Sequence, residues 1–301
     1  MDRRLGADAG LAARMFLTMF LLAALYLGFI AVLIQAGADL FTIILFAGLM
    51  LGLQYYYSDR LVLWSMGARL VDEREAPELH AMINRLVALA DLPKPRVAVV
   101  HTPMPNAFAT GRSPQHSVVA VTTGLLERLN RAEIEAVLAH ELTHIKNRDS
   151  MVLTLASFFA TVASLILRWG RFGLYGGYGY GRRRDRDDGM SAIVLIYLAS
   201  LVVWILSFFL IRALSRYREY AADRGAAIIT GAPANLASAL MKISGVMQRI
   251  PDRDLREVEA LNAFFIIPAL KGSAIAELFS THPSLENRIR HLQRIEQELR
   301  R

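Results

Sequence analysis

Four long apolar segments constrain the fold of this chain more than any other feature. They run from Met15 to about Ala36, from Leu40 to about Tyr57, from about Ser150 to Leu167, and from Met190 to about Ile211. Each is close to the roughly 20 residues that a helix needs to cross the hydrocarbon core of a bilayer. Hydrophobic residues make up 54% of the 301 residues, and the mean hydropathy is +0.34. We therefore predict a mostly α membrane protein with four transmembrane or membrane-inserted helices.

The first two segments predict a tight helical hairpin, because only Gly37–Asp39 join them. Tyr55–Tyr57 fit the aromatic belt at a membrane interface. The first segment is too long, and too closely followed by another, to be a cleaved signal peptide. The alternative is that these segments are buried core helices.

The second pair of segments is separated by Arg168–Gly189, which is rich in Gly, Tyr and Arg and is expected to form a flexible loop. Arg3, Arg4 and Arg14 favour a cytoplasmic N-terminus, and two spans then return the chain from Asp59 onward to the cytoplasm. If the second pair also spans, its basic loop lies outside, against the positive-inside tendency. We favour spanning, with re-entrant or partly protein-buried segments as the alternative.

Local patterns predict several elements in the polar sequence. Pro77–Ala90 carries apolar residues at helical spacing. Short Val-rich stretches at Arg96–Val100, Ala107–Thr110 and Ser117–Val121 predict a small sheet. Asn130 and Glu133 together form a capping-box pattern, which predicts that a helix starts there.

That helix would carry His140-Glu141-Leu142-Thr143-His144, an H-E-x-x-H motif. Residues four apart lie one turn above each other on one helix face, so both imidazoles can bind one metal ion. Glu141 lies between them, where it can activate a metal-bound water. The chain has no cysteine, which excludes disulfides, thiolate ligands and a cysteine nucleophile.

A hydrolytic zinc site needs a third protein ligand and one position for water. The best candidate is Glu219, and Asp223 lies one helical turn later, where it can accept a hydrogen bond from the other ring nitrogen of a ligand histidine. The alternatives are a solvated or salt-bridged Glu219, or a structural site with a fourth protein ligand, which the sequence does not suggest. We predict one Zn²⁺ per chain, bound by His140, His144 and Glu219, with Glu141 as the general base.

The zinc ligands should lie close to the membrane. His144 comes six residues before the third apolar segment and Glu219 eight after the fourth, or roughly 9–12 Å if helical. Substrates would then be membrane proteins or unfolded chains presented at the bilayer. We expect four parts, which are a transmembrane hairpin (1–57), a first catalytic part (58–149), a second membrane hairpin (150–211) and a second catalytic part (212–301).

Four stretches of this sequence resemble the HtpX family of membrane zinc proteases. They are the H-E-x-x-H motif, Asn106–Ala109, Glu219–Asp223 and Thr281–Ile289. The resemblance covers almost the whole chain and implies a gluzincin, a group that includes the prenyl-protein endoprotease of the endoplasmic reticulum. It implies a zincin-like α+β catalytic domain on the cytoplasmic face of the bacterial inner membrane, acting in quality control of misfolded or damaged membrane proteins.

The resemblance also implies roles for residues outside the zinc motif. Asn106, Ala107 and Phe108 would lie on an edge strand to which an extended substrate adds, although an ordinary start of a strand is the alternative. His282 would stabilise the oxyanion, with Arg288 assisting. The alternative for His282 is that it only precedes a helix.

Other functions fit the sequence less well. The net charge of +7 allows nucleic-acid binding, but the arginines cluster beside apolar segments and no basic stripe carries interleaved aromatics. A transporter would need ionisable residues inside its spans, and these segments have almost none. A catalytically inactive zinc-binding scaffold or chaperone is the main rival, and the presence of Glu141 argues against it.

Overall fold

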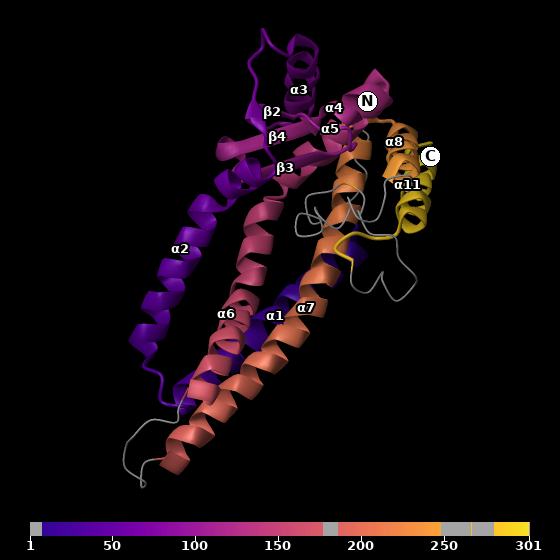
Figure 1. The fold of residues 1–301 in the computed structure, drawn as a ribbon. Coiled ribbons are helices and arrows are strands. Elements are labelled where there is room, and N and C mark those ends of the chain that lie inside the picture. Colours follow the sequence, from indigo (N-terminus) through magenta and orange to yellow (C-terminus); the bar gives the residue numbers. More distant parts are fainter. Residues whose placement is uncertain (1–7, 177–185, 248–265, 267–279, 301) are drawn as a thin grey trace. The chain divides into compact units, whose positions relative to one another are not determined.

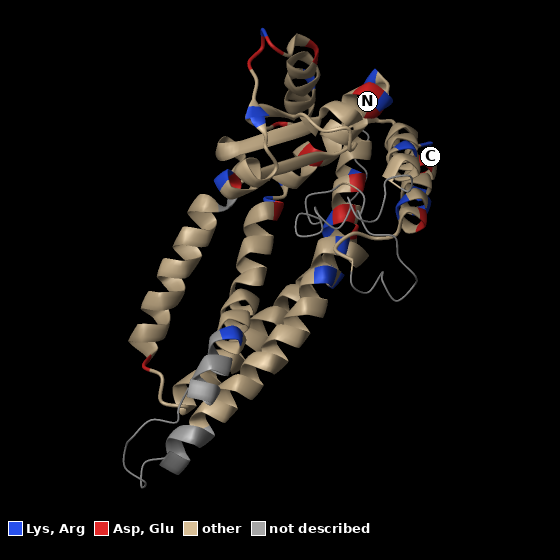
Figure 2. Ribbon diagram, in the orientation of Figure 1, with Lys and Arg blue, Asp and Glu red and all other residues tan. Residues whose placement is uncertain are grey.

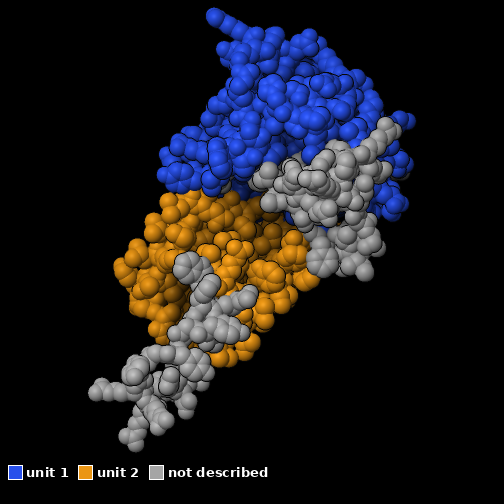
Figure 3. Space-filling model, in the orientation of Figure 1, with its two compact units in different colours: residues 1–12, 56–152, 215–301 blue, residues 13–55, 153–214 orange. Residues whose placement is uncertain are grey.

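The structure is a computed structural model that describes residues 8–176, 186–247, 266 and 280–300. The chain divides into two compact units (Figure 3). The first unit contains residues 1–12, 56–152 and 215–301, and the second contains residues 13–55 and 153–214. Each unit therefore combines segments that are far apart in the sequence. The four-part domain division drawn from the sequence stays a prediction.

Four helices among the described residues are long and apolar enough to cross a membrane, as predicted. Their bounds are α1 (Ala9–Gln35), α2 (Leu40–Ser65), α6 (Asp149–Gly176) and α7 (Arg186–Thr230) (Figure 1). Charged residues are rare along the ribbons of α2 and of the apolar parts of α6 and α7 (Figure 2). Helices suit such segments because a bilayer core offers no partner for an unpaired backbone group.

The bounds expected for the loop, Arg168–Gly189, are wrong at both ends. Helix α6 continues to Gly176 and α7 already begins at Arg186. Helical hydrogen bonding satisfies the backbone at both ends of the loop, which composition alone did not indicate. The remainder of that loop, residues 177–185, lies outside the described residues.

Within the second unit, α1 packs against α6. The Tyr26 hydroxyl donates to the carbonyl of Ala156, and the rings of Tyr26 and Phe159 lie 4.7 Å apart. Helix α2 contributes Gln54, whose Nε2 lies 3.4 Å from Ser157 Oγ. Large apolar side chains nevertheless stay exposed on α2, and none of its apolar window is buried. Such a surface is stable in lipid but not in water.

The first unit contains a four-stranded sheet in the order β1-β2-β4-β3. The strands are β1 (Arg69–Leu70), β2 (Arg96–Val100), β3 (Ala107–Gly111) and β4 (Ser117–Thr122). Strands β2 and β4 are parallel, and the other two pairs are antiparallel. The three longer strands β2, β3 and β4 agree with the sequence-based prediction, whereas β1 has two residues and no pattern that predicts it. Strand β3 forms one edge of the described sheet.

Besides the 3₁₀-helix η1 (Pro114–His116), five α-helices lie wholly in the described part of this unit. They are α3 (Pro77–Ala90), α4 (Thr123–Arg128), α5 (Arg131–Lys146), α8 (Pro233–Met247) and α11 (Leu285–Arg300). The predicted capping box is present at the start of α5, where Asn130 and Glu133 exchange backbone and side-chain hydrogen bonds of 3.0 and 2.9 Å. Glu133 also accepts from Ser238 Oγ and Lys242 Nζ on α8. These contacts fix where α5 begins.

Helix α5 lies at the centre of the unit's core and contacts α3, α8, β3 and β4. The core around it consists of buried aliphatic side chains, including Ile83, Leu86, Val119, Val137, Leu138, Leu240 and Ile243. Helix α7 approaches α5 closely at Gly225, where an added Cβ would lie 2.3 Å from Thr143 Cγ2. A glycine is therefore required at this crossing.

Candidate metal centre

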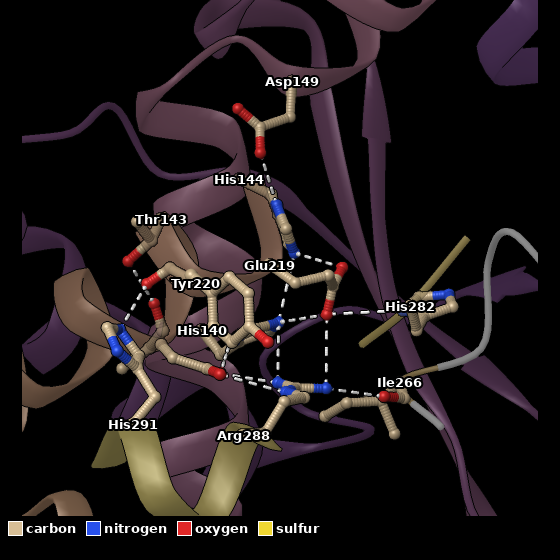
Figure 4. Close-up of polar contacts among 12 residues, drawn as sticks. His140, Thr143, His144, Asp149, Glu219, Tyr220, Ile266, His282, Arg288 and His291 are labelled. Carbon is tan, nitrogen blue, oxygen red and sulfur yellow. Dashed lines mark hydrogen bonds and ion pairs between the residues drawn. The ribbon is translucent and has the colours of Figure 1, made fainter. Parts of the chain in front are cut away.

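The structure brings together the three residues that the sequence proposed as metal ligands. His140 and His144 come from successive turns of α5, and Glu219 comes from α7 (Figure 4). One potential ligand atom from each lies within 4.8 Å of the others. The two Nε2 atoms are 3.1 Å apart, and the Glu219 carboxylate oxygens lie 3.6 Å from His140 Nε2 and 3.5 Å from His144 Nε2.

The donor atoms suit a cation. Two imidazole nitrogens facing each other at 3.1 Å repel unless a proton or a metal ion lies between them. Glu219 Oε2 is buried and makes no hydrogen bond within the described residues, although Arg288 Nη1 lies 3.2 Å away. Two imidazoles and one carboxylate form a common ligand set for a catalytic zinc ion. These side chains therefore fit the metal that the motif implies.

The charges of the histidines lead to the same conclusion. Burial lowers the pKa of His140, but Asp223 and Glu219 outweigh it and raise the pKa to about 9. Burial, together with the nearby His140, lowers the pKa of His144 to about 4. Without a metal ion, these pKa shifts place an extra proton, and with it a positive charge, on His140 rather than on His144. One positive charge is favoured at the place where the imidazoles converge.

Asp223 lies directly behind His140. Its Oδ1 lies 3.0 Å from His140 Nδ1, which leaves Nε2 of that ring directed toward Glu219. Asp223 is fully buried and pairs with Arg288, whose Nε and Nη2 donate to the two carboxylate oxygens at 3.0 and 2.5 Å. The Asp223 carboxylate thus holds the His140 ring in place, and Arg288 holds the carboxylate.

Asp149 is a site residue that the sequence analysis missed. Its Oδ2 lies 2.6 Å from His144 Nδ1, and its other oxygen pairs with the buried Arg218. The chain reaches this geometry because α5 ends at Lys146 and Arg148 adopts a left-handed φ of 54°, which turns Asp149 back toward His144. A buried acidic residue that opens an apolar helix needs a partner, and that signal could have indicated Asp149.

Glu141 lies beside the ligand cluster and is only 4% exposed. Burial raises the pKa of its carboxyl group, and the cationic charge on the neighbouring histidines partly offsets this. A carboxylate with a raised pKa takes up a proton more readily than one in water. The local chemistry therefore suits a general base.

His282 and Arg288 both lie next to Glu219. The Nδ1 atom of His282 is 3.3 Å from Glu219 Oε2, and the residue is 5% exposed. Arg288 directs its donors at Asp223, at Glu219 and at the carbonyl of Ile266. Its guanidinium is thus engaged with carboxylates and one backbone oxygen. The oxyanion role of these two residues stays a prediction.

Asn106, Ala107 and Phe108 lie at the start of the edge strand β3 and are buried. Ala107 and Phe108 pair with β4. The Asn106 side chain accepts a hydrogen bond of 3.0 Å from the backbone of Ile266, whose carbonyl accepts from Arg288. Ile266 therefore links this edge of the sheet to the charged cluster, which no sequence pattern indicated.

Known proteins resemble this chain along its whole length. A model of peptidase family M48 matches residues 73–296. The Protease HtpX homolog of Moorella thermoacetica is 70% identical over 299 residues, which cover 99% of each chain. Protease HtpX homolog 2 of Methanosarcina mazei is 60% identical over 299 residues, which cover 99% of this chain and 100% of the relative. This level of identity shows a common family.

A solved structure shares the fold. The crystal structure of S. mikatae Ste24p aligns over 95% of this chain and 67% of its own, with a TM-score of 0.55 and 18% sequence identity. At this identity the likeness concerns the fold alone. The four apolar helices identify an integral membrane protein. From the family match, the relatives and these helices together, the chain belongs to peptidase family M48 and is a membrane metalloprotease of the HtpX type.

Proposed function

We propose that this metalloprotease is a zinc endopeptidase that hydrolyses peptide bonds at the cluster of His140, His144 and Glu219. The observation that carries the proposal is the convergence of these three side chains beside the buried Glu141. Zinc suits two imidazoles and a carboxylate, and the chain has no thiolate to offer. When bound, zinc would activate a water molecule and polarise the carbonyl of the peptide bond.

Glu141 would carry out the proton transfers. It follows His140 by about 100° round α5, which places its carboxylate beside the metal ligands. It would take a proton from the attacking water and deliver it to the leaving nitrogen. Its raised pKa supports this role, because the carboxylate can then hold the proton between the two steps.

The edge strand β3 would bind the substrate. It is the edge strand of the described sheet, and an edge strand is the kind of element beside which an extended polypeptide can bind as an additional strand. Asn106, Ala107 and Phe108 would position that strand. His282 is our candidate for stabilising the oxyanion, and Arg288 would act indirectly by holding Asp223 and Glu219.

The substrates we propose are misfolded or damaged membrane proteins and unfolded chains near the bilayer. The apolar helices support this, because α7 runs without a break from an apolar stretch to Glu219. We place the protein in the inner membrane. The basic residues near the N-terminus favour a cytoplasmic N-terminus, and with it a catalytic unit on the cytoplasmic side of that membrane. The resemblance to HtpX proteases supports a role in protein quality control.

The test is the Glu141→Gln variant, which keeps the size and polarity of the side chain but removes the base. It should bind one zinc ion per chain, as the wild type does, and should cleave an unfolded or membrane-embedded test substrate at least 100-fold more slowly. Zinc content by mass spectrometry and cleavage by gel electrophoresis measure the two effects. Unchanged turnover would remove Glu141 as the base, and chelator-resistant turnover would remove the metal. A scaffold or chaperone would show no cleavage even in the wild type.

A further inference from the structure

Each of the two histidines proposed as metal ligands has a carboxylate at its Nδ1, and each carboxylate is paired with a buried arginine. One set is His140, Asp223 and Arg288, and the other is His144, Asp149 and Arg218. The first set contains the Asp that the sequence predicted. In the second set, Asp149 and Arg218 lie outside both the H-E-x-x-H motif and the Glu219–Asp223 stretch. Its members come from three different helices.

The second set is well buried and its carboxylate uses both oxygens. Asp149 is 5% exposed and Arg218 is 3% exposed. One oxygen of Asp149 lies 2.6 Å from His144 Nδ1, and the other forms an ion pair with Arg218 Nη2. A buried carboxylate between an imidazole and a guanidinium is held in one orientation, because turning it would break both contacts.

The place of this pair in the fold links two metal ligands. Asp149 opens α6 directly after the turn that follows His144. Arg218 immediately precedes Glu219 on α7. Asp149 contacts both His144 and Arg218, and Arg218 is the residue next to the third ligand, Glu219. The contact between Asp149 and Arg218 therefore fixes this part of α7 relative to His144. A shift of α7 that moved Glu219 away from the histidines would also break this ion pair.

We propose that Asp149 and Arg218 are positioning residues that orient His144 toward the metal ion. Asp149 accepts a hydrogen bond from the Nδ1–H of His144, which selects the tautomer whose Nε2 presents a lone pair to the metal. The negative charge of Asp149 makes that nitrogen more basic. Arg218 holds the carboxylate in this orientation. The proposal rests on the zinc site proposed above, and it adds a second Asp to the one predicted at Asp223.

A purely structural role would leave the metal unaffected. Asp149 lies in the first turn of α6, where an acidic side chain stabilises a helix regardless of any metal. Its pairing with Arg218 would then only join α6 to α7. Zinc affinity distinguishes the two roles, because helix stabilisation does not alter the basicity of His144 Nε2.

The experiment measures zinc dissociation constants by competition with a chromophoric chelator. All proteins are the full chain in detergent and carry Glu141→Gln, which removes the proposed general base and leaves the metal ligands intact. Loss of a carboxylate behind a metal-bound histidine typically weakens metal binding 10–100-fold, and we expect this for Asp149→Ala. Asp149→Asn should lose less zinc affinity, because its amide oxygen can still accept a hydrogen bond from the Nδ1–H of His144. The zinc affinity of Arg218→Met should lie between that of Asp149→Asn and that of the parent.

Two further measurements complete the design. The control is Glu298→Gln on α11. It removes an exposed carboxylate that pairs with Arg224, an arginine on α7 like Arg218, and should leave zinc affinity within twofold of the parent. The double variant Asp149→Ala with Arg218→Met should bind zinc no more weakly than Asp149→Ala alone, if Arg218 acts through Asp149. Additive losses would show that Arg218 acts independently, against the proposal.

The possible outcomes separate this proposal from the zinc site itself. If the Glu141→Gln parent binds no zinc, the proposed function fails. If the parent binds one zinc ion and Asp149→Ala stays within twofold of it, the positioning role is wrong while the zinc site stands. Isosteric Asp149→Asn guards against misfolding: with the metal removed its melting temperature should fall, because the buried Arg218 loses its charged partner, but it should still unfold in one cooperative transition. A change in melting temperature without a change in zinc affinity supports the structural role alone.

Discussion

Helix α5 and the apolar helices place their side chains in opposite environments. On α5, the ionisable residues His140 and Glu141 are only 1% and 4% exposed. On α2, the apolar residues Phe41 and Ile44 are 71% and 61% exposed. In the first case the protein surrounds polar groups with partners, and in the second it leaves apolar groups for lipid to cover. The comparison shows that burial alone does not identify the core of such a protein, because the two units face different solvents.

The two environments also differ in what a substitution disrupts. Around α5, a lost side chain leaves a charge without a partner or a cavity in close-packed protein. On the outer face of α2, lipid tails can fill the space that a lost side chain leaves. Substitutions in the first region should therefore have large effects, and comparable ones in the second should have small effects.

The largest effect is expected when one member of the buried charge cluster is removed. Arg288→Met takes the guanidinium away from Asp223 and Glu219, which are both buried. An uncompensated buried charge typically reduces the free energy of unfolding by about 3–5 kcal/mol. Chemical denaturation of the chelator-treated protein in detergent measures this change.

The matched control for that prediction is Arg290→Met on the same helix. Arg290 pairs with Glu286 at 3.1 Å, but both side chains are more than half exposed. Its loss should change the free energy of unfolding by less than about 1 kcal/mol. Similar losses for Arg288→Met and Arg290→Met would contradict the assignment of Arg288 to a buried cluster.

An intermediate effect is expected where α7 crosses α5. Gly225→Ala places a Cβ 2.3 Å from Thr143 Cγ2, so one helix must move. Overpacking of this kind typically costs about 1–3 kcal/mol. Adding Thr143→Ala to Gly225→Ala should restore part of the loss, and a double-mutant cycle of unfolding free energies measures the coupling. The control is Gly245→Ala on α8, where the new methyl group meets no atom of the described residues within 4 Å, so the change should be neutral or slightly stabilising. Equal effects at the two glycines would show that the helices do not cross closely.

The smallest effect is expected on the outer face of α2. Leu45 is 60% exposed, so Leu45→Ala should lower the free energy of unfolding in lipid vesicles by less than about 1 kcal/mol, because lipid tails replace the lost contacts. Leu138 on α5 is fully buried, and Leu138→Ala should lower it by about 2–5 kcal/mol. Comparable losses for the two leucines would mean that the outer face of α2 packs against protein rather than lipid.

Local patterns were sufficient to predict much of the fold. The helix at Pro77–Ala90 and the strand at Arg96–Val100 have the expected bounds, and the capping box of Asn130 and Glu133 forms as expected. These features depend on residues close together in the sequence, where periodicity and capping are informative. The two-residue strand β1 and the ends of α6 and α7 were missed, because tertiary contacts and backbone continuity decide them.

The candidate site was predictable only in part. The spacing of His140 and His144 and that of Glu219 and Asp223 follow from one helix each, and the structure brings both pairs together. Asp149 was not recognised, because the left-handed turn at Arg148 that directs it toward His144 is visible only in the structure. Contacts between distant segments, such as that of Arg288 with Asp223, leave no periodic signal in a single sequence.

The most direct test is a crystal structure of the Glu141→Gln protein grown with zinc, with data collected above and below the zinc absorption edge. We predict one anomalous peak within about 2.0–2.2 Å of His140 Nε2, His144 Nε2 and a Glu219 carboxylate oxygen, and no fourth protein ligand. A peak elsewhere, Glu219 directed away from the ion, or a fourth side chain bound to it would contradict the account.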